Sequence, residues 1–538
     1  SHKASPPQNS LCFSSTHPSA NLCEKIRSGG TRSFGCASRR QNGNSPFHHL
    51  TISPLGIVRR QGLRNTVISY LGLALGFVST ALVLPRILAP QQLGLTSTLS
   101  SIATLFAQVA AFGFASVGIR FFPYFRNPKA GHHGFLPFLL GVPLLGFAVV
   151  AGLYFLGRPL VLRWYDSDAA VLGAFYPWVA VLALFTLLYS LLDAYLKALF
   201  HTAFSSFLQD IVLRVLIVGG ALLLAAGYLS FPGYVLWFVG ANGALLLLLT
   251  GYLAYIGELH LRPTRQVLAV RPVRELLSVG AFTLLSSLSG AIIMYIDTIM
   301  VGAQVNLAAV GIYQVAFNIS TALAIPARSL NKIAFPLLAD YWKQHDLPRM
   351  ADFYRRTTRL NTLIGCYLAL GIGLNLDFIY SLMRADYAQG TVVVLLLLGS
   401  RLFDGITGVN GLIVVTSPRY RSDLFFNVSL AVLTIVLNAV LIPRLGIVGA
   451  AVAAVVAQVS INLARTWFVW HSYQMQPFTW RIPLILLLAA GAGLAGWLVP
   501  ALASPLLTML LRSAVLTLMY GGLVLATGTA PEALELLH

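Results

Sequence analysis

The side chains with the greatest chemical capacity are charged residues that fall inside long apolar stretches of the chain. Arg214, Arg401, Asp297 and Asp404 all lie in such stretches. An ionised group in an apolar layer is costly, so its presence there indicates a role in binding or transport. A guanidinium binds a phosphate group through two parallel hydrogen bonds, whereas a buried carboxylate can take up a proton or a cation.

The depth of Arg214 favours contact with a polar cargo. Arg214 lies about 10 residues, or roughly 15 Å, into its apolar stretch. Arg401 is also deep, and Asp404, three residues further on, can pair with it on one helix face. Both arginines therefore have a second interpretation, as structural partners of neighbouring side chains. Asp297 also has two interpretations. It can couple transport to H⁺ or Na⁺, or it can pair with a cationic residue.

Three further basic residues, Arg120, Arg328 and Lys332, lie at the predicted inner ends of apolar stretches. Arg120 and Lys332 each precede a Phe-Pro pair by a few residues. Such a pair at the inner mouth of a cavity can capture a pyrophosphate. The alternative is that these residues only anchor helix ends at the membrane surface.

Composition indicates the class of protein. Hydrophobic residues make up 57% of the chain and charged residues only 10%, whereas soluble domains carry about 25% charged residues. The chain cannot cover a water-facing surface, so a bilayer is the expected solvent. Its apolar runs of about 20 residues match membrane helices rather than barrel strands, which need about 10. We therefore predict an all-α integral membrane protein.

We expect about 14 transmembrane helices. They lie near residues 65–86, 95–118, 135–157, 171–192, 204–227, 233–256, 278–301, 307–330, 358–379, 388–415, 424–442, 447–470, 482–500 and 506–527. With the N-terminus in the cytoplasm, the inner segments hold 20 Lys and Arg and the outer loops hold 6. This asymmetry follows the positive-inside rule and places both termini in the cytoplasm. It also accounts for the basic composition without a nucleic-acid partner.

An internal repeat indicates two lobes. Residues 84–123 and 299–336 share a helix end, a short outer turn, a glycine, a helix and a basic residue before Phe-Pro. The two stretches are six spans apart, which predicts two six-helix lobes and two extra C-terminal helices. Parallel repeats of this kind suit alternating access around a central cavity. A chance likeness between two helical hairpins is the alternative. The predicted parts are a tail over 1–54, lobes over 55–256 and 278–471, a basic linker over 257–277, and a C-terminal part over 472–538.

Several segments resemble the multidrug/oligosaccharidyl-lipid/polysaccharide flippase superfamily, in particular its bacterial polysaccharide-biosynthesis branch. They are LGLALGFVSTALVLPRILAPQQLGL at 71–95, YIDTIMVG at 295–302 and LNAVLIPRLGIVGAAVAA at 437–454. The resemblance covers about 55–527. It implies a two-lobed bundle in the bacterial cytoplasmic (inner) membrane. It also implies transport of a polyprenyl-pyrophosphate-linked oligosaccharide for polysaccharide or lipopolysaccharide assembly.

The predicted function is therefore that of a flippase without cofactor or catalytic step. Its partners are the lipid-linked oligosaccharide, membrane lipids and polysaccharide assembly enzymes. One alternative is an ion-coupled drug or small-metabolite antiporter of the same superfamily, and another is a membrane glycosyltransferase or polymerase. Asp166 and Asp168 form a DxD pattern, which in membrane glycosyltransferases can hold a metal or a sugar phosphate. Here the pattern lies in an outer loop of only about 13 residues without an extramembrane domain, which argues against catalysis. His132-His133 has no carboxylate or cysteine at ligand spacing, so no metal site is predicted.

The N-terminal tail differs from the rest of the chain. Residues 1–54 are polar and basic and lack apolar periodicity, so disorder is expected. The first methionine is Met294. We expect that the tail is a translated upstream frame and that the native protein starts near Leu55. A genuine basic tail is the alternative.

Overall fold

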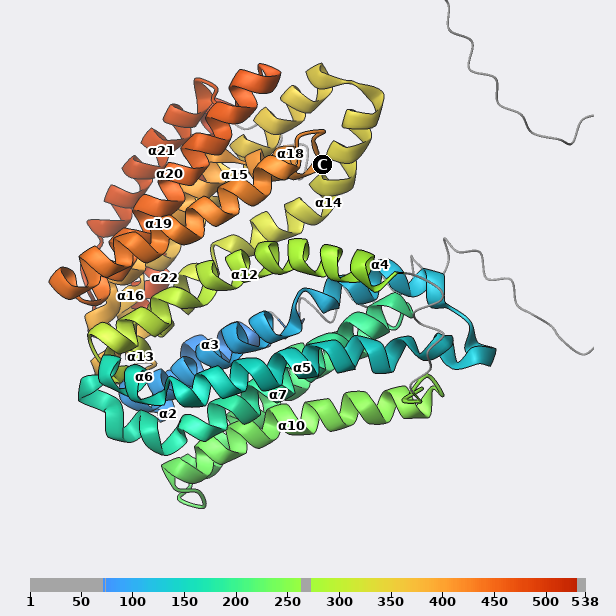
Figure 1. Ribbon diagram of the computed structural model, residues 1–538. Coiled ribbons are helices and arrows are strands. Elements are labelled where there is room, and N and C mark those ends of the chain that lie inside the picture. Colours follow the sequence, from blue (N-terminus) through green and yellow to red (C-terminus); the bar gives the residue numbers. More distant parts are fainter. Residues whose placement is uncertain (1–70, 73, 263–271, 530–538) are drawn as a thin grey trace, which may run out of the picture. The chain divides into compact units, whose positions relative to one another are not determined.

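The computed structural model describes residues 71–72, 74–262 and 272–529. The predicted tail, the first part of the first span and the central part of the linker lie outside these ranges. Within the described ranges every regular element is a helix (Figure 1). The predicted all-α class is therefore confirmed.

The helices before the linker follow the first six predicted spans. Those that overlap the spans are η1 (Val78–Val83) with α2 (Leu84–Ile87), α3 (Pro90–Ala111) with α4 (Phe114–Phe125), α5 (Phe135–Leu156), α7 (Ala169–Ala198), α8 (Thr202–Phe207) with η4 (Leu208–Val212) and α9 (Leu213–Ala225), and α10 (Phe231–Tyr255). Short helices in the connections are η2 (Pro128–Gly134), α6 (Arg158–Trp164) and η3 (Asp166–Asp168). Helices α3, α5, α7 and α10 run side by side in Figure 1, where α3 packs on α5 and α7, and α7 packs on α10.

The helices after the linker follow the remaining spans. They are α12 (Val273–Gln304), α13 (Leu307–Thr321), α14 (Ala324–Gln344), α15 (Leu347–Leu374), α16 (Leu376–Ser381), η5 (Ala385–Gly390), α17 (Thr391–Thr407), α18 (Asn410–Thr416), α19 (Arg421–Leu445), α20 (Ile447–Tyr473), α21 (Arg481–Trp497) and α22 (Pro505–Thr527). Helix α19 packs on α20, and α15 packs on α17 and α21. Helices α14 and α15 extend beyond their predicted spans into the charged segment between them.

The number of membrane spans is only partly confirmed. In the described ranges 10 helices are long and apolar enough to cross a membrane, or 11 if the bent pair α13–α14 forms one span. Ala74–Ile87 and Arg481–Trp497 are apolar but shorter. A multi-pass membrane protein is therefore established, whereas the count of 14 stays a prediction.

Both repeat units contain a helix that is interrupted once. In the first unit, Phe112 and Gly113 adopt left-handed backbone angles, with φ of 47° and 70°, between α3 and α4. A Cβ atom on Gly113 would lie 2.3 Å from the carbonyl oxygen of Gly280 on α12, so only glycine fits there. In the second unit, α13 and α14 meet at a bend of 52°. The interruptions divide each repeat helix into an outer and an inner part.

The two repeat units pack on each other through glycines. A Cβ atom on Gly94 of α3 would lie 1.7 Å from the carbonyl oxygen of Leu307. A Cβ atom on Gly311 of α13 would lie 2.0 Å from the carbonyl oxygen of Pro90. Such close backbone approach is what small residues permit between membrane helices. These glycines hold equivalent positions in the two repeat units, at the predicted outer end of the bundle.

The buried apolar core also joins the two halves of the chain at this outer end. One cluster combines Leu84, Leu88 and Leu93 with Val301, Tyr313 and other residues from α13 to α20. Helix α12 packs on both α3 and α19. The division into two lobes stays a prediction, since α12 and this cluster connect the parts that the repeat separates.

Candidate functional site

A central polar cavity lies between segments from both halves of the chain. Its volume is about 560 Å³. Its polar lining residues are Ser79, Thr80, Thr96, Ser97, Ser100, Ser101, Gln209, Asp210, Arg214, Tyr234, Tyr295, Gln314, Asn318, Thr321 and Arg328. The lining thus combines hydroxyls, amides, two guanidinium groups and the carboxylate of Asp210 with apolar side chains, and its assignment as the predicted central cavity stays a proposal. Such groups can bind a hydrated, anionic cargo through hydrogen bonds.

Arg214 points its side chain at the backbone of the first span. A Cβ atom on Gly76 would lie 2.4 Å from Cζ of Arg214, so the guanidinium occupies the space that glycine leaves open. In the part of the chain that the structure describes, the Nε atom of Arg214 is buried without a hydrogen-bond partner. Asp210, one turn earlier, faces Gly72, and a Cβ atom on Gly72 would lie 2.4 Å from Cβ of Asp210. Asp210 and Arg214 also lie within electrostatic range of each other, so the cavity wall carries this guanidinium together with a carboxylate.

Arg328 and Arg401 lie on the C-terminal side of the cavity. Arg328 lines the cavity from α14. The guanidinium of Arg401 lies over the ring of Phe317, with Cζ 5.5 Å from its centre, and Phe317 also lines the cavity. Arg401 and Asp404 line a small adjoining pocket of about 30 Å³. The structure thus brings Arg214, Arg328 and Arg401 to one region.

Arg120 and Lys332 are not part of the cavity lining. Both side chains are exposed on the inner parts of the two repeat helices. Cζ of Arg120 lies 5.7 Å from the ring of its neighbour Phe121. Lys332 lies within electrostatic range of Asp210. Their predicted role as a paired inner mouth is a proposal that rests on the repeat alone.

Asp297 is buried in a polar contact among three helices. Its Oδ2 accepts a hydrogen bond from the hydroxyl of Tyr313 on α13 at 2.8 Å. Its Oδ1 accepts one from the Nδ2 of Asn438 on α19 at 2.7 Å. The Oδ1 of Asn438 is buried and has no partner among the residues that the structure describes. A carboxylate next to an unpaired amide oxygen offers the oxygen ligands that a small cation requires.

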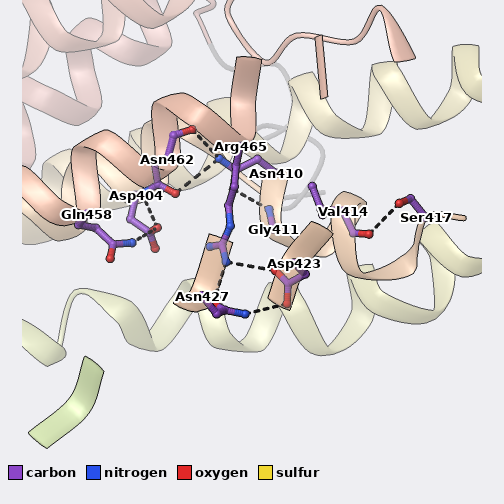
Figure 2. Close-up of polar contacts among 10 residues, drawn as sticks. All are labelled: Asp404, Asn410, Gly411, Val414, Ser417, Asp423, Asn427, Gln458, Asn462 and Arg465. Carbon is purple, nitrogen blue, oxygen red and sulfur yellow. Dashed lines mark hydrogen bonds and ion pairs between the residues drawn. The ribbon is translucent and has the colours of Figure 1, made fainter. Parts of the chain in front are cut away.

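Asp404 belongs to a network of amides rather than to a pair with Arg401. Its Oδ1 accepts hydrogen bonds from Gln458 at 3.0 Å and from Asn462 at 2.9 Å, both on α20 (Figure 2). Among the described residues, no ion pair joins Arg401 to Asp404, so the alternative in which these two side chains pair on one helix face finds no contact to support it. Because Asp404 turns to α20 instead, the guanidinium of Arg401 is left to stack on Phe317.

The same network continues along α20 towards the predicted inner side. Asn410 donates to the hydroxyl of Thr466 at 3.1 Å, next to the break between α17 and α18. Arg465 donates to Asp423 at 3.1 Å and to Asn427 at 2.8 Å (Figure 2). These contacts satisfy polar groups inside the bundle and hold α18, α19 and α20 together.

Polar contacts also join the two repeat units near their predicted outer end. Asp168 accepts hydrogen bonds from Nε2 of Gln91 at 3.0 Å and from the backbone N–H of Leu307 at 2.7 Å. Tyr165 donates to the carbonyl oxygen of Ile299 at 3.0 Å. Burial raises the pKa of Tyr165, so its hydroxyl stays protonated and remains a donor. The DxD pattern thus contributes a structural contact between the repeat units.

An apolar cavity lies beside the arginines. It has a volume of about 450 Å³ and lies between α15, α17 and α21. Its lining includes Cys366, Leu370, Leu395 and Leu486, and Leu402 lines both this cavity and the pocket that contains Arg401. A charged pocket and an apolar surface are therefore adjacent along α17.

Comparison with known proteins identifies the family. The family model for polysaccharide biosynthesis proteins matches residues 59–342, more than half of the chain. The chain belongs to this family. No curated protein sequence matches it.

Solved structures show that the fold of this chain is similar to that of transporters of the multidrug/oligosaccharidyl-lipid/polysaccharide superfamily. The lipid II flippase MurJ in an inward closed conformation matches with a TM-score of 0.68 and 11% identity, over 86% of this chain and 98% of that chain. A multidrug resistance MATE family transporter in an inward-facing conformation matches with a TM-score of 0.60 and 12% identity, over 77% and 98%. At these identities the likeness concerns the fold.

Some residues of this family member's site were not predicted. Gly72 and Gly76 lie four residues apart, as do Asp210 and Arg214, which face them. The equal spacing of the two pairs is a signal in the sequence, but nothing in it indicates which span faces which. Asn438, the partner of Asp297, also comes from a distant helix.

Proposed function

We propose that the protein is a flippase that moves a polyprenyl-pyrophosphate-linked oligosaccharide across the bacterial cytoplasmic membrane. The observation that supports this most is the polar cavity with Arg214 and Arg328 in its lining. Arginine suits a pyrophosphate because its planar fork donates two parallel hydrogen bonds. The serine, threonine and amide side chains around it suit the hydroxyls of a glycan.

The apolar cavity between α15, α17 and α21 supports a lipid-linked cargo in particular. A polyprenyl chain is apolar and can stay among apolar side chains while its headgroup enters the polar cavity. Leu402 lines the apolar cavity and also the pocket of Arg401. In this proposal Arg401 binds the pyrophosphate at the junction of headgroup and tail. Arg120 and Lys332 attract the headgroup at the inner mouth.

Alternating access completes the proposed cycle. We propose that the contacts of Asp168 and Tyr165 close the predicted outer end and that the headgroup enters from the cytoplasmic side. Release to the outer leaflet requires these contacts to break while the inner parts of the repeat helices approach each other. We propose that the cargo is supplied by glycosyltransferases of polysaccharide assembly, and that this chain performs no chemical step itself.

The buried Asp297 is the proposed site of ion coupling. It lies within electrostatic range of Arg401, so a proton or Na⁺ on Asp297 changes the field at the proposed headgroup site. Asp404, held by two amides, is the second candidate. In the Asp297→Asn variant, we expect the transport rate to be independent of the ion gradient.

Reconstitution tests the proposal. The purified protein is placed in liposomes that contain a fluorescent polyprenyl-pyrophosphate oligosaccharide, and a membrane-impermeant reagent reports which lipid is in the outer leaflet. We expect the protein to expose the inner-leaflet pool, in contrast to protein-free liposomes. Movement of this lipid at the protein-free rate, with saturable transport of a small cationic drug instead, would favour an antiporter. The likeness to the MATE transporter makes that the second candidate.

A further inference from the structure

Two histidines and a glutamate from distant parts of the sequence meet on the predicted inner side. His132 lies in the connection between α4 and α5, and Glu258 and His260 follow the end of α10. One ligand atom from each of these side chains lies within 4.8 Å of the other two. The sequence offers His132 no carboxylate nearby, whereas the fold supplies one that is 126 positions away.

The backbone is shaped to bring His132 inward. Gly131, His132, His133 and Gly134 all have positive φ, between 54° and 73° for the glycines and at 52° and 54° for the histidines. Non-glycine residues rarely adopt this conformation, and it concentrates at functional sites. The turn buries the imidazole of His132, which is 1% exposed. Its ring lies against Phe122 and His260, at ring-centre distances of 5.1 Å and 5.5 Å.

His260 contributes a nitrogen that lacks a partner. Its Nδ1 is buried and makes no hydrogen bond within residues 71–72, 74–262 and 272–529. A Cβ atom on Gly131 would lie 3.1 Å from Cδ2 of His260, so the ring packs on the glycine of the strained turn. Glu258 is about a quarter exposed, with 25% of its side chain accessible, which leaves a path from water to the cluster. This imidazole nitrogen is therefore free of hydrogen bonds among the described residues, and His260 offers a ring nitrogen close enough to the carboxylate for both to bind one ion.

We infer that His132, Glu258 and His260 form a binding site for a divalent transition-metal ion with the ligand preference of Zn²⁺. Two imidazoles and one carboxylate suit zinc, whereas Mg²⁺ and Ca²⁺ prefer oxygen ligands only. Three protein ligands leave one position of a tetrahedral ion open to water. The ion would join the α4–α5 connection to the chain segment that follows α10, where the link between the two halves of the molecule begins.

The site must rearrange slightly to accept the ion. Nε2 of His132 lies 2.7 Å from Oε2 of Glu258, a hydrogen-bond distance, whereas two ligands of a tetrahedral zinc ion lie about 3.3 Å apart. The backbone N–H of Asn127 donates to Nδ1 of His132 at 3.1 Å. Coordination through Nε2 moves the ring proton to Nδ1 and breaks that hydrogen bond. The alternative is a hydrogen-bonded brace that holds no metal.

Metal titration distinguishes a zinc site from a hydrogen-bonded brace that holds no metal. The full chain is purified through a histidine-free affinity tag, freed of metal with a chelator and titrated with Zn²⁺ against a chromophoric zinc indicator. We expect one Zn²⁺ per chain, and affinity lowered by about tenfold or more in His260→Asn and Glu258→Gln. His201→Asn is the matched control, because His201 also lies on the predicted inner side and contacts the hydroxyl of Tyr252 at 3.0 Å.

A second readout does not depend on the variants. Co²⁺ bound by the wild-type chain should give visible absorption bands of a nitrogen- and oxygen-ligated ion, and Zn²⁺ should remove them. Absence of stoichiometric Zn²⁺ binding by the wild-type chain would overturn the site. Equal Zn²⁺ affinity in the wild-type chain and in a folded His260→Asn variant would overturn it too.

Discussion

At the scale of single residues, the position of Arg214 depends on the absence of a side chain at Gly76. The guanidinium fills the space where a Cβ atom would stand, and its Nε has no hydrogen-bond partner among the described residues. The sequence was enough to single out Arg214, because an arginine inside an apolar stretch is costly and indicates a functional role. The role of Gly76 could not be predicted, since Arg214, which it faces, lies on another span.

Removal of the positive charges should stop transport without loss of the protein. We expect Arg214→Ala and Arg401→Ala each to lower the flipping rate by about tenfold or more, because each loses a charge-assisted contact to the pyrophosphate. Arg356→Ala is the control, since Arg356 is exposed and pairs with Asp352 on its own helix. Normal transport by both alanine variants, at normal expression, would contradict the assignment of these arginines.

A methyl group at Gly76 should act through Arg214. We expect Gly76→Ala to displace the guanidinium and to reduce transport several-fold, with little change in the thermal unfolding temperature, because the obstructed atoms are the end of a flexible side chain. Gly219→Ala is the matched control on α9, where no atom lies within 4 Å of the added carbon. Equal flipping rates for the two variants would show that the position of Arg214 does not matter.

At the scale of elements, the repeat was the most informative feature of the sequence. It indicated equivalent helices, and the structure shows that each of them is interrupted. Gly94 of α3 lies against the first residue of α13, and Gly311 of α13 lies against the first residue of α3. The interruptions were not predicted. At Phe112–Gly113 the break depends on close approach of α12, a tertiary contact that local sequence does not reveal.

The polar contacts between helices were also beyond the sequence. The spacing allowed Asp404 to pair with Arg401 three residues away, but two amides on α20 donate hydrogen bonds to Asp404 instead. Local spacing predicts which side chains can meet on one helix. It does not predict competition from a neighbouring helix, which decides the partner here.

The outer closure can be tested at Asp168. We expect Asp168→Asn to favour opening of the outer end by about tenfold, because a charge-assisted hydrogen bond to Leu307 becomes a neutral one. The measurement is the rate at which a membrane-impermeant thiol reagent, added outside, labels Ser97→Cys in the cavity of a chain whose other cysteines are replaced. Asp166→Asn is the control, since Asp166 is exposed. Unchanged labelling in Asp168→Asn would contradict a closing role.

At the scale of the whole molecule, composition was enough to predict an all-helical membrane protein, and the order of apolar runs predicted the order of the helices. The position of the cavity required the structure, because its lining comes from the first, second, fifth, sixth, seventh and eighth predicted spans. The predicted site residues divide accordingly. Arg214 and Arg328 line the cavity, whereas Arg120 and Lys332 are exposed beyond it.

Native mass spectrometry of the protein, purified gently from its own host, tests the central claim most directly. We predict a co-purifying polyprenyl-pyrophosphate glycan on the wild-type chain, and its loss from Arg214→Ala. The mass of the adduct would also identify the glycan. Repeated absence of such a lipid, with drug or small-metabolite adducts in its place, would contradict the flippase account.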